Sequence, residues 1–342
     1  MKLIRFLTVA SPAPQFGIVV RDQAVSLSTL QSKAGNSSPH LGNSRSYLAN
    51  LPGSEQAAKE LLAWGERYFH MLGPGEKYPL DSVRLLEPIE VVALFDFGLT
   101  PRHLKNSGET IGTYEKDNPQ TAPLLQAFAK AVITPKSAPP AGQPEPLSYY
   151  KSNMNTIVGD DETIPWPAYT SRLDIEPELA VVYGNEQQPL AGFCIFNDIS
   201  ARDLQATEFV GGFCLTKDMA KGNQLGPYLV TRDEVGDPYN LKVTVLVDGQ
   251  VKYQGSTSEI SHKADDVFAW LGFIAPLKAG TVAGFGTIPD CTGCDHDDFI
   301  DPGAEIQIIF ERLGRLRCRF ASPVGKLLPS RWPVRESLQK YH

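Results

Sequence analysis

Short apolar runs bounded by turn-forming residues recur along most of this 342-residue chain, and they restrict it to a fold dominated by β-strands. From residue 91 onward the runs are Val91–Leu94, Leu179–Tyr183, Tyr228–Val230, Leu241–Val247 and Ile306–Phe310. Asp248-Gly249 separates the fourth run from the next segment, and this dipeptide is typical of a two-residue β-hairpin turn. The pattern predicts an all-β or α+β architecture with long loops.

The first 85 residues have a different pattern. Apolar runs at Leu3–Val9, Phe16–Val20 and Ala24–Leu27 alternate with turns, which predicts short hairpin strands. Between residues 54 and 71 apolar side chains recur at roughly helical intervals, and a Gly-Pro-Gly stop follows at 73–75. We therefore expect a small N-terminal β/α domain over residues 1–85 and a larger domain over residues 86–342, since chains of this length commonly form two domains. Five prolines between Pro135 and Pro146 predict an irregular surface loop.

Charge and hydropathy exclude several classes of protein. The 32 Lys and Arg are outnumbered by 39 Asp and Glu, and no basic run is interleaved with aromatic residues, so nucleic acid is not an expected partner. Neither a signal peptide nor a membrane span of about 18 apolar residues is recognisable, and Arg5 interrupts the N-terminal apolar stretch. We expect a cytoplasmic protein that does not bind a membrane.

The five cysteines are odd in number and irregularly spaced, which favours reduced thiols. Cys291-Thr292-Gly293-Cys294 invites a zinc or redox interpretation. A structural zinc site needs four ligands, and the sequence offers no second pair, so this motif favours a turn with two ordinary thiols.

Acidic residues at alternate positions lead into one apolar run. Asp174, Glu176 and Glu178 precede Leu179–Tyr183. Residues two apart on a strand point to one face, so Glu176 and Glu178 can present two carboxylates side by side. Adjacent like charges repel each other, and a hard divalent cation relieves the repulsion. A solvated polar edge would show the same pattern, so the motif alone leaves both interpretations open.

The segment from Gly192 to Gln205 decides between them. An apolar run ends in Asn197-Asp198 and continues as Ser-Ala-Arg-Asp, as at a strand end before a helix start. Together with Glu176-x-Glu178, this segment resembles the fumarylacetoacetate hydrolase family, whose members carry an acidic Glu-x-Glu strand followed by Asn-Asp-x-Ser-Ala-Arg-Asp-x-Gln. The resemblance extends over roughly residues 90 to 330.

The resemblance implies a fold and a metal site. The implied fold is α+β and mostly β, a mixed β-roll or distorted barrel with an N-terminal appendage, usually assembled as a homodimer. The implied metal ligands are Glu176, Glu178 and Asp198, with Asp96 as a fourth candidate. Carboxylate oxygens suit Mg²⁺, or Mn²⁺ or Ca²⁺.

The resemblance also implies groups that act on a substrate. Lys217 takes the place of the family's active-site lysine, and Thr287 lies in a Gly-Thr turn similar to the one that touches the substrate carboxylate. Arg202 and Gln205 either orient the substrate or the metal ligands, or tie the helix start to the barrel.

His103 is the candidate general base, because its segment resembles the one that carries the family's catalytic histidine, with Asp96 seven residues earlier. Many relatives place a Glu three residues after this His, where the chain has Asn106. Glu109 is the nearest replacement in sequence, and another Glu from a different loop is the alternative. The polar segment from Leu99 to Pro119 is expected to close over the substrate as a lid.

These residues predict a metal-dependent hydrolase that cleaves a C–C bond in an acylpyruvate or 2,4-diketo acid during catabolism. The same metal-bound enolate would also serve a decarboxylase, isomerase or dehydratase of a small 2-oxo acid. An inactive metal-binding protein on this fold is the alternative from another class, and the intact set of implied ligands argues against it.

Overall fold

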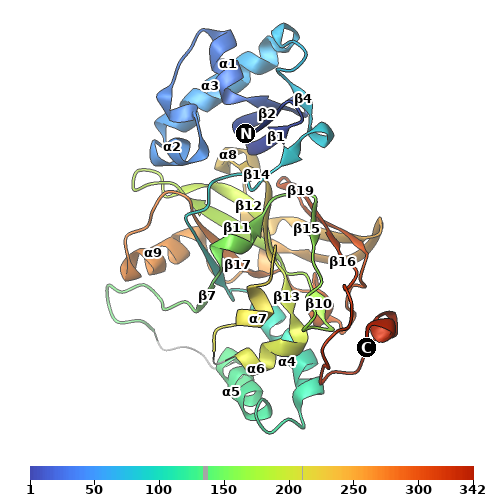
Figure 1. The fold of residues 1–342 in the computed structure, drawn as a ribbon. Helices are drawn as coiled ribbons and strands as arrows, with labels where there is room; N and C mark the ends of the chain where they lie inside the picture. Colours follow the sequence, from blue (N-terminus) through green and yellow to red (C-terminus); the bar gives the residue numbers. More distant parts are fainter. Residues whose placement is uncertain (134–137, 210) are drawn as a thin grey trace.

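The computed structural model describes residues 1–133, 138–209 and 211–342, and β-sheets form its centre (Figure 1). The larger sheet has 12 strands. Its path is β4 (Tyr78–Pro79), β3 (Gln23–Ser26), β2 (Ser11–Val20), β1 (Lys2–Thr8), β14 (Asn223–Val230), β12 (Leu190–Asp198), β11 (Pro177–Tyr183), β17 (Thr281–Thr287), β6 (Ala93–Phe97) and β7 (Tyr149–Lys151), while β5 (Arg84–Leu85) pairs with β1 and β8 (Ile157–Val158) pairs with β14.

A second sheet has five strands, in the order β16 (Gln250–Ser256), β15 (Lys242–Val247), β18 (Glu305–Phe310), β19 (Gly314–Phe320) and β9 (Glu162–Ile164). A short pair, β10 (Leu173–Asp174) and β13 (Ser200–Ala201), stands apart from both. The expected α+β, mostly β fold is confirmed. Along the described residues, none of the sheets closes on itself. The two larger sheets are therefore open and do not form a closed barrel.

The central strands are buried on both faces. In β11, Leu179 and Val181 belong to the core that also contains side chains of β15, β18 and β19, whereas Ala180 and Val182 belong to the core beneath the N-terminal helices. Successive strand residues point to opposite faces, so a strand covered on both sides must be apolar without interruption. This explains why the sequence shows continuous apolar runs here rather than alternation.

The hairpin predicted at Asp248-Gly249 is confirmed. β15 and β16 pair antiparallel with Val247 opposite Gln250, and both turn residues have positive φ, 49° for Asp248 and 78° for Gly249. Two positive φ values match the right-handed twist of the flanking strands.

The N-terminal segment contains the expected strands and helix, and it continues the larger sheet through β1, which pairs with β14. Three helices pack against this part of the sheet, α1 (Leu27–Ala34), α2 (Ser44–Ala49) and α3 (Gly53–Arg67), and Figure 1 shows them at one end of the molecule. The domain boundary at residue 85 stays a prediction.

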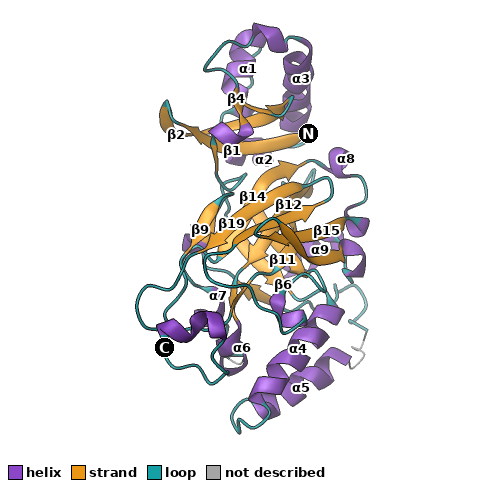
Figure 2. Ribbon diagram, turned by 90° about the vertical axis from the view of Figure 1, so that its right-hand side faces the viewer, coloured by secondary structure: helices purple, strands orange, loops and turns teal. Residues whose placement is uncertain are grey.

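Helices α4 (Pro101–Glu115), α5 (Ala122–Ile133), α6 (Arg202–Glu208) and α7 (Cys214–Lys217) lie at the opposite end (Figures 1 and 2). The remaining α-helices are α8 (Arg232–Val235) and α9 (Ala264–Ile274). The 3₁₀ helices are η1 (Pro39–Leu41), η2 (Phe69–Met71), η3 (Leu80–Ser82), η4 (Met154–Thr156), η5 (Pro238–Asn240), η6 (Thr257–Glu259), η7 (Gly293–Asp295) and η8 (Glu336–Tyr341). Within the described ranges, no helix is both long and apolar enough to cross a membrane.

Two expectations about loops meet different outcomes. The proline-rich segment has no regular structure from residue 138 to residue 146, and its residues 135–137 lie outside the described residues. The segment expected to act as a lid is mostly the helix α4, and one face of this helix is buried. Whether it moves on substrate binding stays a prediction.

Candidate active site

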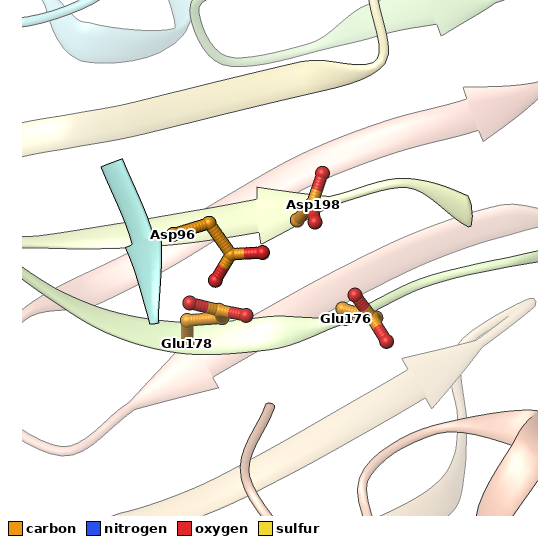
Figure 3. A group of neighbouring side chains, drawn as sticks. All are labelled: Asp96, Glu176, Glu178 and Asp198. Carbon is orange, nitrogen blue, oxygen red and sulfur yellow. The ribbon is translucent and has the colours of Figure 1, made fainter. Parts of the chain in front are cut away.

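Four carboxylates from β6, β11 and β12 of the larger sheet, or from the residue directly before β11, converge (Figure 3). Asp96 lies in β6, Glu178 lies in β11 with Glu176 directly before it, and Asp198 ends β12. One carboxylate oxygen from each residue lies within 4.8 Å of those of the other three. The structure therefore brings together all four residues that the sequence proposed as metal ligands.

Glycines in β17 make room for this convergence, because β17 lies between β11 and β6. A Cβ atom at Gly284 would lie 2.4 Å from Glu178 Oε2, so any side chain there would collide with this carboxylate. Two residues on, the Gly286 amide donates a hydrogen bond to the same oxygen at 2.9 Å. The Glu178 carboxylate therefore lies directly against the backbone of β17, which requires that position 284 has no side chain.

The cluster has the properties of a site for a divalent cation. Two oxygens on opposite sides of an ion that each bind at 2.0–2.6 Å are about 4 to 5 Å apart, as the carboxylate oxygens are here. Asp198 Oδ1 is buried and has no hydrogen-bond partner among the described residues. The contacting cations Lys217 and Arg202 offset only part of the charge that four ionised carboxylates would carry, so a divalent ion would balance the remainder.

Lys217, at the end of α7, lies among the carboxylates. Its ammonium group contacts Glu176 Oε2 and Asp198 Oδ2 and lies 3.9 Å from Asp96 Oδ2. Burial disfavours the charged amine, but Asp198 and Glu176 outweigh burial and raise the pKa of Lys217 above its ordinary value. The lysine is therefore a permanent positive charge inside the site.

The carboxylates differ in their electrostatic surroundings. Burial raises the pKa of Glu178 well above the ordinary value, and the neighbouring carboxylates Asp96 and Asp198 raise it further. Burial acts in the same direction on Glu176, but Arg202 and Lys217 outweigh it and hold the pKa of Glu176 well below the ordinary value. Glu176 is thus the carboxylate most firmly held in its charged form.

Arg202 is fully buried at the start of α6 and connects two carboxylates. Its Nη1 lies 2.6 Å from Glu176 Oε1, and its Nε donates to Asp174 Oδ2 at 2.9 Å. Gln205 accepts a hydrogen bond from Arg202 Nη1 at 3.0 Å. Both residues therefore hold the ligand Glu176 in place, and a direct contact with substrate stays a prediction, as it does for the buried Thr287 opposite Glu178 in β17.

His103 lies in the first turn of α4, and its two ring nitrogens face different acids. Nδ1 is 2.7 Å from Asp295 Oδ1, and Nε2 is 3.5 Å from Glu176 Oε1. Burial lowers the pKa of the ring, but Asp295 and Glu176 together raise the pKa of His103 to about 9. The imidazole is oriented by Asp295 and directed at the carboxylate cluster.

The expectation that Glu109 partners His103 is corrected here. The Glu109 side chain is 68% exposed, and its ion-pair partner is Lys105, at 3.9 Å. Glu109 lies six residues after His103, so in a helix of 3.6 residues per turn it points away from the histidine's face.

The sequence did not identify Asp295 as the partner of His103. Asp295 directly follows Cys291-Thr292-Gly293-Cys294, a motif that was interpreted by its two thiols. Cys291 and Cys294 are buried free thiols, and burial raises the pKa of both, so they are not reactive thiolates. The same turn positions Asp295, whose Oδ2 also accepts from the Asp290 amide at 2.8 Å. The sequence feature that could have indicated Asp295 is an acidic residue in the turn after β17, the strand that ends in Gly286-Thr287.

Comparison with known proteins places this site in a family. Residues 122–321 match the family model described as fumarylacetoacetate hydrolase, C-terminal. The Homo sapiens protein named oxaloacetate tautomerase, mitochondrial, is 33% identical over 180 residues, which are 50% of this chain and 57% of that protein. The match thus spans little more than half the length of this relative.

Solved structures share the fold over nearly the whole chain. Maleylpyruvate hydrolase from Sphingobium sp. SYK-6, in complex with manganese(II) and pyruvate, has a TM-score of 0.63 and 16% identity, covering 95% of this chain and 100% of that one. A 2-keto-3-deoxyarabinonate dehydratase has a TM-score of 0.62 and 20% identity, with the same coverage of both chains. At these identities the likeness establishes the fold alone.

Proposed function

The chain belongs to the fumarylacetoacetate hydrolase family, whose members are metal-dependent enzymes, and from this premise we propose that it hydrolyses a C–C bond in an acylpyruvate or a 2,4-diketo acid. The observation that carries the proposal is the contact between His103 Nδ1 and Asp295 beside the four carboxylates. Water activation requires an oriented base, and Asp295 supplies the orienting acid for His103 that the sequence had not identified.

Asp96, Glu176, Glu178 and Asp198 would hold the divalent ion. When bound there, Mg²⁺ or Mn²⁺ supplies a Lewis acid for the 2-oxo group of the substrate. Lys217 adds a fixed positive charge at the same place, where negative charge develops as the C–C bond breaks. Preorganised positive charge of this kind stabilises the transition state because it needs no reorganisation during the reaction.

The His103–Asp295 pair defines the direction of proton transfer. In the neutral form of His103, with the Nδ1 proton donated to Asp295, Nε2 is free to accept a proton from water. A cation held by Glu176 would lower the pKa of about 9 that His103 has beside the metal-free carboxylates, and would so favour this neutral form. The resulting hydroxide attacks the carbonyl distal to the 2-oxo acid, and the C–C bond breaks. The electron pair of that bond becomes the enolate of pyruvate, which takes up the proton, so that the products are pyruvate and a carboxylic acid.

Oxaloacetate tautomerisation is the second candidate, favoured by the name of the relative that is 33% identical. It needs proton transfer at one carbon and no attack by water. Isomerases, decarboxylases and dehydratases of 2-oxo acids need the same enolate stabilisation. These reactions therefore stay alternatives, and a dehydratase is among the proteins of similar fold. The presence of all four carboxylates and Lys217 argues against an inactive metal-binding protein.

The test is a substrate panel with Mn²⁺ or Mg²⁺, comprising acetylpyruvate and longer acylpyruvates, oxaloacetate, and a 2-keto-3-deoxy sugar acid. We expect pyruvate and a carboxylic acid from an acylpyruvate, and a loss of about 10²-fold or more in His103→Ala. Accelerated keto–enol exchange of oxaloacetate without cleavage of any acylpyruvate would replace the hydrolase proposal with the tautomerase.

A further inference from the structure

Four side chains at four-residue intervals form the buried face of α4: His103, Ser107, Ile111 and Glu115. With 3.6 residues per turn, such positions lie along one side of a helix. His103 lies in the first turn and Glu115 is the last residue, about 18 Å away along the axis at 1.5 Å per residue. The buried face therefore connects the active site with a distant point in the structure.

At that distant point, Trp332 in the segment after β19 contacts the last two residues of α4, Tyr114 and Glu115. Trp332, 1% exposed, donates its indole N–H to Glu115 Oε1 at 2.9 Å, and its ring stacks on Tyr114 with centroids 4.3 Å apart. Glu115 Oε2 accepts hydrogen bonds from Asn118 and Thr121, both at 2.7 Å. The Trp332 indole is thus the donor to one of the two oxygens of a buried carboxylate.

The middle of the helix packs along the segment that carries Asp295. Ile111 shares a hydrophobic cluster with Cys294, Phe299 and Trp332, and Tyr114 donates its hydroxyl proton to Asp297 at 2.8 Å. His103 and Asp295 therefore belong to two segments that pack against each other, and Trp332 packs against both through Tyr114 and Phe299.

Apart from the contacts of His103 itself, the start of α4 is held by exposed ion pairs. Arg102 pairs with Glu259 and with Asp290, but its side chain is 44% exposed. Exposed ion pairs contribute little to stability because water and salt screen them. Compared with these exposed pairs, the buried contacts at the far end restrain rotation of the helix about its axis more strongly.

We propose that Trp332 is a positioning residue for His103, acting through Glu115 and the buried face of α4. This inference rests on the proposed function, in which His103 is the general base. Releasing the far end of α4 lets the helix turn or fray, which moves the imidazole relative to Asp295 and the carboxylates. A displacement of about 1 Å at a reacting group can cost 10²-fold in rate.

The main variant is Trp332→Phe, which keeps an aromatic ring against Tyr114 but removes the N–H donor to Glu115. Trp166→Phe is its matched control, because Trp166 is also buried and donates its indole N–H to a backbone oxygen, that of Thr170, at 2.9 Å. A second variant tests the acceptor: Glu115→Ala removes the carboxylate oxygen that accepts from Trp332.

The measurements are kcat, KM, the affinity for Mn²⁺ by calorimetry, and hydrogen exchange of the amides of residues 101–115. Trp332→Phe and Glu115→Ala should lower kcat about 10-fold or more, leave KM and Mn²⁺ affinity within about 2-fold, and speed up exchange in α4. Trp166→Phe should behave like the parent in kcat and in α4 exchange. A merely destabilised protein would lose thermal stability without this selective loss in kcat.

Two failures are distinguishable. If His103→Ala slows turnover but Trp332→Phe does not, or if Trp166→Phe slows it equally, the positioning role is overturned and the proposed function stands. If His103→Ala leaves turnover unchanged, the base is elsewhere, and both proposals fail together.

Discussion

In the proposed mechanism, Asp295 orients the general base His103. It accepts from one ring nitrogen of His103 and is itself held by the Asp290 amide. We expect Asp295→Asn to lower kcat by 10² to 10⁴-fold, roughly the range between a lost base and a base held in the wrong tautomer. Mn²⁺ affinity should change little, because Asp295 is not among the clustered ligands. Steady-state kinetics together with a Mn²⁺ titration checks this, and an unchanged kcat would contradict it.

The same pair predicts how the stability of the metal-free protein depends on pH. Burial opposes protonation of His103, but Asp295 and Glu176 raise its pKa to about 9, above the value near 6.5 of an unfolded chain. A folded-state pKa above the unfolded one stabilises the protein fully below pH 6.5, and the contribution is lost as pH rises through 9.

Urea unfolding in EDTA at several pH values, for the parent and for Asp295→Asn, measures this contribution. The parent should be the more stable of the two at pH 6, and the difference in free energy of unfolding should shrink toward pH 9.5. Groups that titrate in both proteins cancel in the comparison. A difference that does not vary with pH would show that the pair does not titrate as described.

At the scale of elements, the sequence predicted the strands well and missed the long helix α4. Continuous apolar runs identified β11 and β15 because both strands contribute to the core. In α4, by contrast, the buried face consists of His103, Ser107, Ile111 and Glu115, of which one is apolar. Hydrophobic periodicity cannot reveal a helix whose inner face makes polar contacts with distant parts of the chain.

In the site, too, one part could be predicted from the sequence and another could not. The metal cluster was predictable because Glu176, Glu178 and Asp198 lie in short motifs on neighbouring strands. The partner of His103 was not, since Asp295 comes from a turn 192 residues later in the chain and only the fold brings the two together.

β17 provides a prediction at this scale. Gly284→Ala would place a Cβ 2.4 Å from Glu178 Oε2, while Gly284 itself has no positive φ that would add backbone strain. We expect the carboxylate of Glu178 to be displaced and Mn²⁺ affinity to fall about 10-fold or more, since a hard cation loses a ligand or binds it in poor geometry.

Gly272→Ala is the matched control, because a Cβ there meets nothing within 4 Å. Calorimetric titration of Mn²⁺ into the three proteins decides the matter. Equal affinity in all three would mean that Glu178 does not need the space over Gly284.

For the whole molecule, the homodimer and the cytoplasmic location stay predictions. Light scattering at several protein concentrations tests the first. A concentration-independent mass of about one chain, 37.5 kDa from the sequence, would contradict the dimer.

Metal binding should stabilise the whole fold, because the cluster joins strands that hold the larger sheet together. Without a cation, burial and mutual repulsion raise the pKa of Glu178 and of Asp198 well above their ordinary values, so the folded state contains carboxylates that resist ionisation at neutral pH. Folding is then opposed by the cost of burying these groups, and an ion that binds only the folded state relieves that cost.

At a Mn²⁺ concentration 100 times its dissociation constant, mass action predicts about 2.7 kcal/mol of stabilisation. For a chain of this size, that amounts to a rise of at least a few degrees in Tm. Thermal unfolding with Mn²⁺ and with EDTA measures the rise, and Glu178→Ala should abolish most of it because one ligand to the ion is lost. Glu109→Ala is the control, since the exposed Glu109 side chain pairs with Lys105 rather than with the cluster, and this variant should keep the full response to Mn²⁺. A Tm that does not respond to Mn²⁺ in the parent protein would remove the physical basis for a metal site at these four carboxylates.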